Sequence, residues 1–471
     1  MKNELILKQS LISKKLEAMS SNSNALMNEQ KRIKVDYIAR VEGQGALDIK
    51  FSNGKVEELK LQIYEPPRFF EAFLIGRGFD EVHELTSRIC GICHCAHQIT
   101  ALQAVENAIG VTVSQQTKDL RKLLALGGII QSHALHLYFL AAPDYLGYES
   151  AISMIPDRLP LVKRGLELKK LGNDIVELIG GRAIHPVTAM INGFTALPKE
   201  RDLEALKKRL KEAKADAIHT VELFTNLKIP NFQRKCEYVA LSHPTEYAIN
   251  EGKLVSSEGL DIAPSEYRKY FKERQVPHSY AKRSSIEGRS SFMVGPLARM
   301  NINFQKLSSD AKSMAKEAGF KPPNFNPFSN NLARAIEILH FIDECIEIIE
   351  HLDLRETNGS FEARAGEGFA ITEAPRGSLY HYYKFDKDGI VEKADIVTPT
   401  AHNVYNIEQD LLHFAPNVID LPLEDATLKC EMLIRAYDPC ISCSVHFLKL
   451  NIRKDERLRS GLRLPKNKRG S

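Results

Sequence analysis

The chain has 471 residues, 43% of them hydrophobic and 26% charged, which is typical of soluble globular proteins with one large domain or two to three packed ones. A net charge of +4 is too small to favour nucleic acid as a partner, and eight cysteines in this length do not make a disulfide framework. No run of about 18 apolar residues occurs, so no transmembrane segment is predicted. The segment before Lys31 lacks the apolar core of a signal peptide.

The N-terminal part of the chain changes character at Ile33. Residues 1–32 are polar, with a Ser/Asn-rich SSNSN stretch, and predict an extension outside the main domain. From Ile33 onward apolar residues alternate on both sides of Asn53-Gly54, which predicts a β-hairpin with a type I′ turn. A second hairpin is predicted late in the chain around Lys387-Asp388-Gly389.

Between the two hairpins the chain is predicted to be mostly helical. Apolar residues recur at three- and four-residue spacing in GICHCAHQITALQAVENAIG and in residues 120–140, 159–179, 203–227 and 332–352. Ser329 is the predicted N-cap of the last helix. Gln131, His133 and His136 interrupt the most apolar stretch, which therefore predicts a buried helix. The fold class that follows is α+β and predominantly helical, a helical bundle core with small antiparallel β elements.

Two Cys-x-x-Cys pairs lie near opposite ends of the chain, Cys90/Cys93 in RICGIC and Cys440/Cys443 in DPCISC. A structural zinc module gathers its pairs within about 15–20 residues. Here nearly the whole chain must fold before the four sulfurs can meet, so a shared site would be a product of the complete fold. Four thiolates in one buried place suit a soft transition metal. The alternatives for the first pair are a fortuitous spacing or a thioredoxin-like redox pair, but no βαβ unit surrounds it.

The local context of each pair favours thiolates. Gly91 is expected to let the backbone pass close to a bound group, and Arg88 together with the start of the following helix would stabilise negative sulfur. Pro439 is expected to lead into a helix that carries Cys440 and Cys443 one turn apart on one face.

RICGIC and DPCISCSVH together resemble the large, catalytic subunit of nickel–iron hydrogenases. The resemblance runs from about Ile33 to His446 and includes, in the expected order, IARVEGQGALDI, EPPRFFEAFLIGR, QSHALHLYFLAAPD, GGRAIHP, EAPRGSL and ADIVTPTAHN. The pattern is most similar to the cytoplasmic, cofactor-linked group that includes the sulfhydrogenase α subunits. The resemblance implies one hydrogenase domain over residues 33–446, reversible cleavage of H2, and a cytoplasmic location.

The resemblance also implies a ligand set for the metals. Cys90, Cys93, Cys440 and Cys443 would hold nickel, with Cys93 and Cys443 also bridging to an iron that carries cyanide and carbon monoxide. A magnesium or similar divalent ion would be bound by Glu71, the main-chain carbonyl of Ile396, and His446.

Further roles are implied around this centre. Glu42 would exchange protons with the Cys440 thiolate, and Arg376 would lie over the pocket. The residues implied to surround the iron ligands are Pro375, Leu379 and Thr400, with Asp144 and Asp438 completing a charged canopy with Arg376, and His185 lying toward the small subunit.

Elementary chemistry agrees with these roles, since heterolytic cleavage of H2 needs a soft, electron-rich metal and a nearby base. A buried Glu42 could be that base, because burial raises a carboxyl pKa, and the planar fork of Arg376 suits several hydrogen bonds. Taken without the motifs, Glu42 would be a solvated or cap residue and Arg376 a surface turn residue. His97, His133 and His136 are better explained as satisfied core histidines, and Cys236, Cys345 and Cys430 as small buried hydrophobes.

Two features depart from the family pattern. His402 stands where many relatives carry tryptophan, which this chain lacks altogether. The chain also continues past His446 with the basic segment Phe447–Ser471, which we expect to be a maturation tail removed by a dedicated protease after nickel-insertion proteins have loaded the metal. The alternative is an ordinary solvated tail that stays in place.

The remaining cysteines are scattered, so iron–sulfur clusters are expected only in a partner small subunit. Diaphorase-type subunits would then carry electrons to a soluble carrier such as NAD(P). Two other functions stay open at this point. A hydrogen-sensing regulatory hydrogenase would share the same ligands, whereas a quinone-reductase core subunit of the same fold would lack the nickel cysteines.

Overall fold

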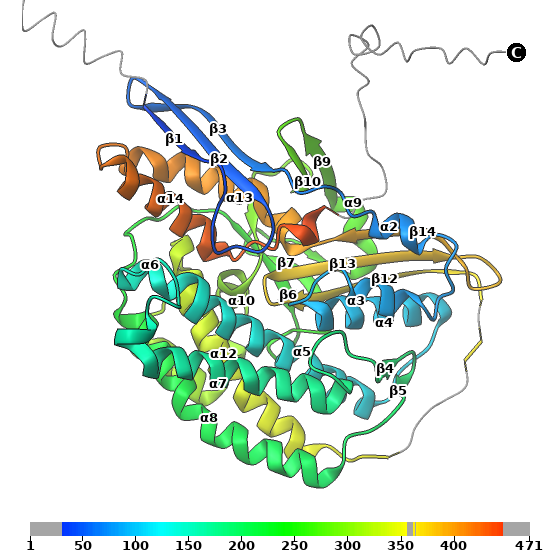
Figure 1. The fold of residues 1–471 in the computed structure, drawn as a ribbon. Helices are drawn as coiled ribbons and strands as arrows, with labels where there is room; N and C mark the ends of the chain where they lie inside the picture. Colours follow the sequence, from blue (N-terminus) through cyan, green and yellow to red (C-terminus); the bar gives the residue numbers. More distant parts are fainter. Residues whose placement is uncertain (1–30, 356–360, 363, 446–471) are drawn as a thin grey trace, which may run out of the picture.

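The computed structural model describes residues 31–355, 361–362 and 364–445. Its largest part is a layer of long helices, seen in the lower half of Figure 1: α5 (Gln115–Leu135), α7 (Ile155–Gly180), α8 (Glu200–Asn226) and α12 (Asn330–His351). α7 contacts both α5 and α8, and α12 contacts α5 and α8. The predicted helix-dominated core is therefore confirmed, with each predicted long helix present.

The strands form small sheets above and beside this layer (Figure 1). Their bounds, sheet by sheet, are β1 (Arg32–Val35), β2 (Gly45–Ser52) and β3 (Lys55–Ile63); β4 (Ala189–Met190) and β5 (Gly193–Phe194); β6 (Glu237–Ser242), β7 (Lys253–Ser256), β8 (Asp261–Ile262) and β11 (Phe292–Met293); β9 (Phe271–Val276) and β10 (Ser279–Ile286); β12 (Gly366–Ala374), β13 (Gly377–Phe385) and β14 (Val391–Val397). Only the β11–β6 pairing is parallel among those described.

Shorter helices connect the layers. They are α2 (Phe70–Leu74), α3 (Val82–Ser87), α4 (His94–Ile109), α6 (Ala142–Leu146), α9 (Tyr267–Tyr270), α10 (Pro296–Asn303), α11 (Ser309–Glu317), α13 (Pro399–Phe414) and α14 (Leu423–Tyr437). α4 packs on β12 and β13, and α13 contacts α14. As a result the start of α4 and the end of α14, which adjoin the two cysteine pairs, face the same interior region.

Both predicted hairpins are confirmed. Asn53 and Gly54 have φ of 52° and 73°, which is the left-handed backbone that a type I′ turn requires between β2 and β3. Gly389 has φ of 76° in the turn between β13 and β14. β1 begins at Arg32, one residue before the predicted domain start, whereas residues 1–30 and the predicted tail Phe447–Ser471 lie outside the described residues.

Three local predictions need correction. Ser329 precedes α12 but makes no side-chain cap; Asn326 accepts from Phe328 N–H and starts a 3₁₀ turn instead. The helix predicted over residues 120–140 begins earlier, at Gln115, and widens into a π-helical turn at His136–Ala141. The DPCISC segment forms a single 3₁₀ turn at Ser442–Ser444 rather than an α-helix.

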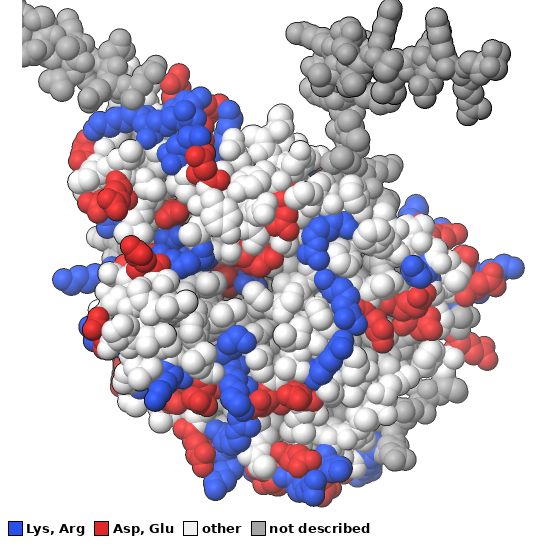
Figure 2. All heavy atoms as spheres, viewed as in Figure 1, with Lys and Arg blue, Asp and Glu red and all other residues white. Residues whose placement is uncertain are grey.

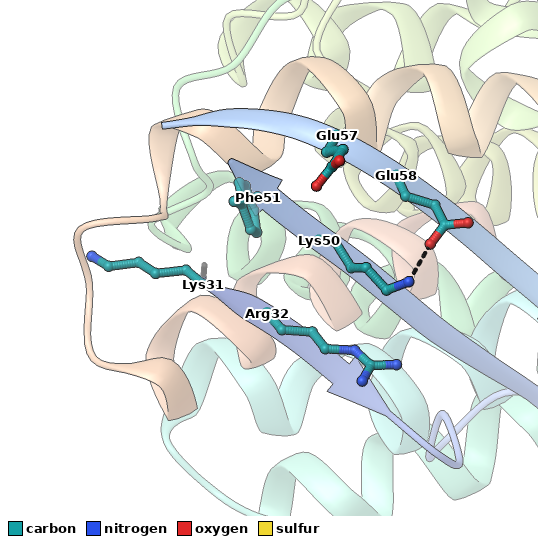
Figure 3. A pocket seen from close by; sticks show the side chains of 6 residues that line it. All are labelled: Lys31, Arg32, Lys50, Phe51, Glu57 and Glu58. Atoms are coloured by element: carbon teal, nitrogen blue, oxygen red, sulfur yellow. Dashed lines mark hydrogen bonds and ion pairs between the residues drawn. The ribbon is translucent and has the colours of Figure 1, made fainter. Parts of the chain in front are cut away.

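The described surface carries charges of both signs and a hollow away from the cysteine pairs. On the face in Figure 2, Lys and Arg side chains are interspersed with Asp and Glu. A hollow of about 670 Å³ lies on the β1–β3 sheet, where Lys50 is paired with Glu58 at 2.5 Å (Figure 3). Its lining residues are on elements that carry no cysteine pair. Gln115–Leu146 is long and apolar enough to cross a membrane, but 83% of its apolar window is buried within the protein.

Candidate metal centre

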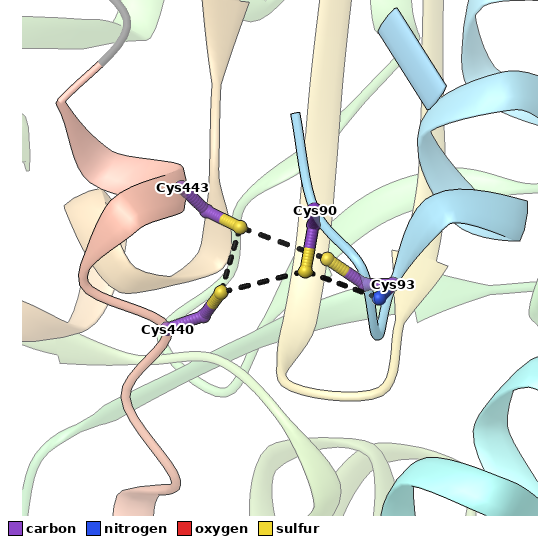
Figure 4. Close-up of side chains that lie close together, drawn as sticks. All are labelled: Cys90, Cys93, Cys440 and Cys443. Carbon is purple, nitrogen blue, oxygen red and sulfur yellow. Dashed lines mark hydrogen bonds between the residues drawn. The ribbon is translucent and has the colours of Figure 1, made fainter. Parts of the chain in front are cut away.

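The four paired cysteines converge in the interior (Figure 4). Cys90 and Cys93 lie between α3 and α4, and Cys440 and Cys443 follow α14. All four are buried, and their sulfurs lie within 4.8 Å of one another. The sulfur of Cys90 is 3.6 Å from that of Cys440, and the sulfur of Cys93 is 3.8 Å from that of Cys443. The prediction that distant pairs meet in one buried place is confirmed.

The sulfur geometry fits a soft metal. A metal about 2.3 Å from each thiolate in a tetrahedral arrangement separates the sulfurs by about 3.8 Å, which matches the two distances that join the pairs. The sulfurs of Cys440 and Cys443 are closer, at 2.7 Å. Among the described residues this is the only group of His, Cys, Asp and Glu side chains with metal-ligand spacing, and its all-sulfur donor set favours a soft transition metal.

The loop before α4 stabilises a thiolate at Cys90. The backbone N–H groups of Ile92 and Cys93 point to its sulfur at 3.3 and 3.2 Å. Hydrogen bonds from the other three thiols, together with the charge of Arg376, hold the pKa of Cys90 well below its usual value against the opposing effect of burial. The positive charge thus comes from Arg376, since Arg88 is exposed. Gly91 is exposed too, and a Cβ there would meet no atom within 4 Å, so it makes no close approach within this chain.

The segment after α14 is fixed by backbone contacts to two distant elements. Asp438 ends α14 in the left-handed conformation, with φ of 55°. Cys440 N–H donates to Oγ1 of Thr400, at the start of α13, at 2.9 Å. Ile441 N–H donates to the carbonyl of Glu42 at 2.9 Å, and Glu42 and Cys440 form a parallel β-bridge. The N-terminal segment and the C-terminal cysteines are therefore held together by their backbones.

The Glu42 side chain reaches the sulfur cluster. The Cys440 thiol donates to its Oε2 at 3.1 Å, and Ser442 N–H donates to the same oxygen at 3.0 Å. Glu42 is only half-buried, in contrast to the fully buried carboxylate expected from the sequence. It connects a buried sulfur to a more accessible part of the chain.

Arg376 lies on the turn between β12 and β13 and is buried. Its Nε donates to the carbonyl of Asp438 at 2.7 Å, and one Nη donates to the Asp438 carboxylate at 3.0 Å. Burial alone would lower the pKa of Arg376, but Asp438 and the cysteine sulfurs outweigh it and raise the pKa well above its usual value. Its other Nη is buried with no partner among the described residues, and is therefore available to a bound group.

The other residues implied around the iron divide into two groups. Pro375 directly precedes Arg376, and Thr400 accepts the hydrogen bond from Cys440 N–H. Leu379 follows Arg376 on β13 and is fully buried. Asp144 instead is bound by Arg435, through two hydrogen bonds of 2.7 and 3.0 Å, and by Arg40. The contacts of Asp144 are thus with Arg435 and Arg40, and its place in a charged canopy with Asp438 and Arg376 stays a prediction.

A second group of predicted ligands meets beside α2. The Ile396 N–H donates to the Glu71 carboxylate at 3.0 Å, so the Ile396 backbone and Glu71 are adjacent. Burial raises the pKa of Glu71 to about 7. Arg68 N–H donates to the carbonyl of Val445 at 2.7 Å, which brings the chain before His446 to the same place. His446 itself lies outside the described residues.

The histidines predicted to be structural have polar partners in the core. His133 bonds Glu337 at 2.8 Å, His136 bonds Asn331 at 3.1 Å, and His97 bonds His381 at 3.2 Å. Each of these core histidines has a polar partner on one ring nitrogen, whereas Nδ1 of His133 is buried without a hydrogen-bond partner among the described residues.

Two other histidines occupy different environments. His402 lies among aromatic rings and bonds the Tyr267 hydroxyl at 2.6 Å, and burial lowers its pKa to about 3. His185 is half-buried and bonds the Ser87 carbonyl at 2.9 Å, close to the first cysteine pair. The isolated cysteines Cys236, Cys345 and Cys430 are buried, as predicted.

The sequence interpretation missed several charged residues that support the centre. Arg299 on α10 donates to the carbonyls of Ala374 and Pro375, beside Arg376, and is bound through both carboxylate oxygens of Glu337. Glu65 accepts from the Ser442 hydroxyl at 2.5 Å. The available signal was a charge within an apolar helix pattern, as in GPLARMN and LARAIEILHF.

Known proteins match this chain over most of its length, in sequence and in architecture. Residues 68–160 and 243–446 match the family model described as nickel-dependent hydrogenase. The chain is 39% identical over 423 residues to sulfhydrogenase 1 subunit alpha of Pyrococcus furiosus, covering 89% of this chain and 98% of that protein. Sulfhydrogenase 2 subunit alpha of the same organism is 38% identical over 428 residues, with 89% and 100% covered. A crystal structure of an NAD+-reducing NiFe hydrogenase in the H2-reduced state superposes on this chain with a TM-score of 0.80 at 27% sequence identity. The superposition covers 89% of this chain and 100% of the hydrogenase chain.

Proposed function

Because this chain belongs to the nickel-dependent hydrogenase family, we propose roles for its residues in the reversible cleavage of H2 to protons and electrons. The predicted family and the predicted large-subunit fold are confirmed. The protein is an oxidoreductase acting on H2, and it functions with a partner subunit. The observation that carries the proposed site is the convergence of the four buried sulfurs within 4.8 Å.

Cys90, Cys93, Cys440 and Cys443 would together hold a nickel–iron centre through their sulfurs. When bound, this centre supplies the soft, electron-rich metal at which the H–H bond is polarised and split. The fit rests on the sulfur distances and on the backbone N–H groups of Ile92 and Cys93, which point to the Cys90 sulfur.

Proton movement in the chain would begin at the Cys440 sulfur. A proton held there is already aimed at Oε2 of Glu42, 3.1 Å away. Ser442 N–H donates to the same oxygen and so holds it in place beside the sulfur. Because Glu42 is half-buried, it can pass the proton outward from an otherwise buried cluster.

Cyanide and carbon monoxide on the iron would be cradled by Arg376, Pro375, Leu379 and Thr400. The support is the unpartnered buried nitrogen of Arg376, because such a donor is costly unless it meets an acceptor. Asp438 would hold the guanidinium in that orientation through its two contacts. Asp144 would act one step further out, by fixing Arg435 and Arg40.

A magnesium ion near the C-terminus would be held by Glu71, the Ile396 carbonyl and His446. Oxygen ligands suit a hard cation, and a bound cation would favour the ionised form of Glu71, whose burial otherwise favours the protonated form.

The electrons would leave through an iron–sulfur small subunit seated near His185. Diaphorase-type subunits would pass them to NAD(P) or another carrier, in line with the NAD+-reducing structural relative. Nickel-insertion proteins and a maturation protease are further proposed partners, and the cytoplasm is the proposed location.

Metal analysis combined with infrared spectroscopy tests this proposal. Protein produced in a host with intact maturation is expected to contain nickel and iron and to show cyanide and carbon monoxide bands. Nickel-free protein from such a host would contradict it. Turnover of the purified complex with an artificial electron acceptor separates an enzyme from a hydrogen sensor, which would be sluggish.

A further inference from the structure

One face of α12 carries three polar side chains in an otherwise apolar stretch. Asn331, Arg334 and Glu337 are spaced by three residues, which puts them on neighbouring turns of the same side of the helix. All three are buried. This face meets α5, α10 and α14, the elements that adjoin the polar side of the sulfur cluster. α12 itself lies in the middle of the helical layer (Figure 1).

Arg334 binds the end of α14 directly. One of its Nη atoms donates to the Ala436 carbonyl at 2.7 Å and the other to the Tyr437 carbonyl at 3.0 Å. The last carbonyls of a helix have no partner within the helix, so the guanidinium acts as a C-terminal cap. The next residue is Asp438, whose left-handed backbone turns the chain toward Cys440.

The burial of Arg334 is hard to explain by stability. It is 0% exposed, and no carboxylate forms a salt bridge with it among the described residues. Burial lowers its pKa to about 10, while Asp438 opposes this only in part. A buried charge without a paired ion usually weakens a fold relative to an apolar side chain of similar size. What the guanidinium provides is a rigid fork that fixes two carbonyls at once.

The Glu337 side chain on this face supports the turn that carries Arg376. Glu337 holds Arg299, which donates to the Pro375 carbonyl at 3.2 Å beside Arg376. The turn that carries Arg376 is closely packed there, since a Cβ on Gly377 would lie 2.7 Å from the backbone nitrogen of Gly295.

The third side chain on this face, Asn331, contacts His136, which in turn contacts Asp438. Asn331 bonds Nε2 of His136 at 3.1 Å, and Nδ1 of His136 is 3.3 Å from the Asp438 carboxylate. Arg334 thus holds the two carbonyls that precede Asp438, while His136 and Arg376 contact the Asp438 carboxylate.

We propose that Arg334 is a positioning residue: by capping α14 it sets the orientation of Asp438, and through Asp438 that of the Arg376 guanidinium and the Cys440 segment. It touches neither cysteine sulfur nor substrate. The part that concerns a bound centre rests on the proposed function, whereas the positioning of residues 438–445 does not.

The substitution Arg334→Lys tests this inference, because an ammonium keeps the charge but does not span two carbonyls with a planar fork. Arg121→Lys is the matched control. Arg121 is also a buried helix arginine, bonded to Glu106 and to the Met190 carbonyl, at a site away from the cysteines. Hydrogen exchange of the full chain without metal is measured first. Amides in residues 438–445 are expected to exchange about tenfold or more faster in Arg334→Lys and at the native rate in Arg121→Lys. Unchanged exchange there, or an increase spread equally over α5 and α12, would overturn the inference.

Infrared spectra of the metal-loaded protein provide the second readout. Arg334→Lys is expected to shift the cyanide bands at unchanged nickel content, because the free nitrogen of Arg376 moves. Bands identical to those of the native protein would refute the link to Arg376. Absence of the bands from the native protein would instead refute the proposed function, and the exchange result would still decide the positioning role. Should Arg334→Lys not fold, Asn331→Ala releases His136 without removing a charge; a smaller shift supports the inference and none overturns it.

Discussion

Glu42 offers the sharpest test of the proposed proton route, because its ability to take a proton can be removed while its hydrogen bonds to the C-terminal cysteine segment are kept. Glu42→Gln keeps the size of the side chain. Its amide oxygen can still accept the hydrogen bond that Ser442 N–H donates to Oε2 of Glu42 at 3.0 Å. The backbone bond between the Glu42 carbonyl and Ile441 is untouched. The variant therefore loses the ability to take a proton from Cys440 while retaining the contacts that hold the C-terminal segment.

The expected magnitude follows from the geometry. A general base at hydrogen-bond distance, such as Oε2 at 3.1 Å from the sulfur, contributes about 100- to 10,000-fold to rate. This corresponds to about 3–5 kcal/mol in the barrier. Glu42→Asp shortens the side chain by one methylene, about 1.5 Å, which breaks direct contact but leaves a water-bridged route. Its activity should lie between those of the native protein and Glu42→Gln.

The assay is H2 oxidation with an artificial acceptor, together with exchange of D2 against solvent protons. Both should fall by a similar factor in Glu42→Gln, at unchanged nickel and iron content. Glu65→Gln is the matched control, since Glu65 bonds Ser442 on the same segment but does not touch a cysteine. If Glu42→Gln retained native exchange with solvent, or if Glu65→Gln lost as much, the proton route through Glu42 would be wrong.

Three other predictions address the metal, the core and the tail. Cys443→Ser replaces a soft donor by a hard one and should reduce nickel per chain by more than about tenfold in metal analysis; full occupancy would argue against this ligand set. His340 has its pKa lowered to about 4 by burial, so its contribution to stability is complete above about pH 6.5 and is lost as pH falls toward 4, by about 1.4 kcal/mol per pH unit. The urea midpoint should therefore fall less steeply between pH 7 and pH 5 in His340→Gln, and equal slopes would contradict this. Intact mass of active, loaded protein should correspond to a chain ending at His446; a chain still ending at Ser471 would refute removal of the tail.

Features set by local chemistry were predictable from the sequence. The Asn53-Gly54 turn follows from the left-handed backbone that these two residues tolerate, and the long helices follow from their three- and four-residue spacing. The two cysteine pairs could be predicted to form a single site only because the chain contains the same Cys-x-x-Cys spacing twice and because few other roles would explain it. Strands such as β11, with two residues, are too short to give an alternating pattern and were missed.

Contacts between distant segments were not predictable, because spacing along the chain does not tell which elements meet. The sequence predicted a charged canopy of Asp144 with Arg376. It did not indicate that the Asp144 carboxylate is bound by Arg40 and by Arg435, which is 291 positions away. Arg334 and Glu337 were assigned no role, because a charged residue on a predicted helix is ordinarily solvated and its burial is decided only by packing.

The π-helical turn at His136–Ala141 amounts to one extra residue in the path of a long helix. Before it, α5 presents His133 to α12, and His136, the first residue of the turn, also contacts α12; after it, α6 presents Asp144 to Arg435. Deleting one residue in this turn would restore a regular helix and yet rotate everything beyond it by about 100°. Asp144 would then face away from Arg435, and Arg40, two positions before Glu42, would lose its anchor. The local irregularity is thus the device that lets one continuous helix serve two partners in different directions.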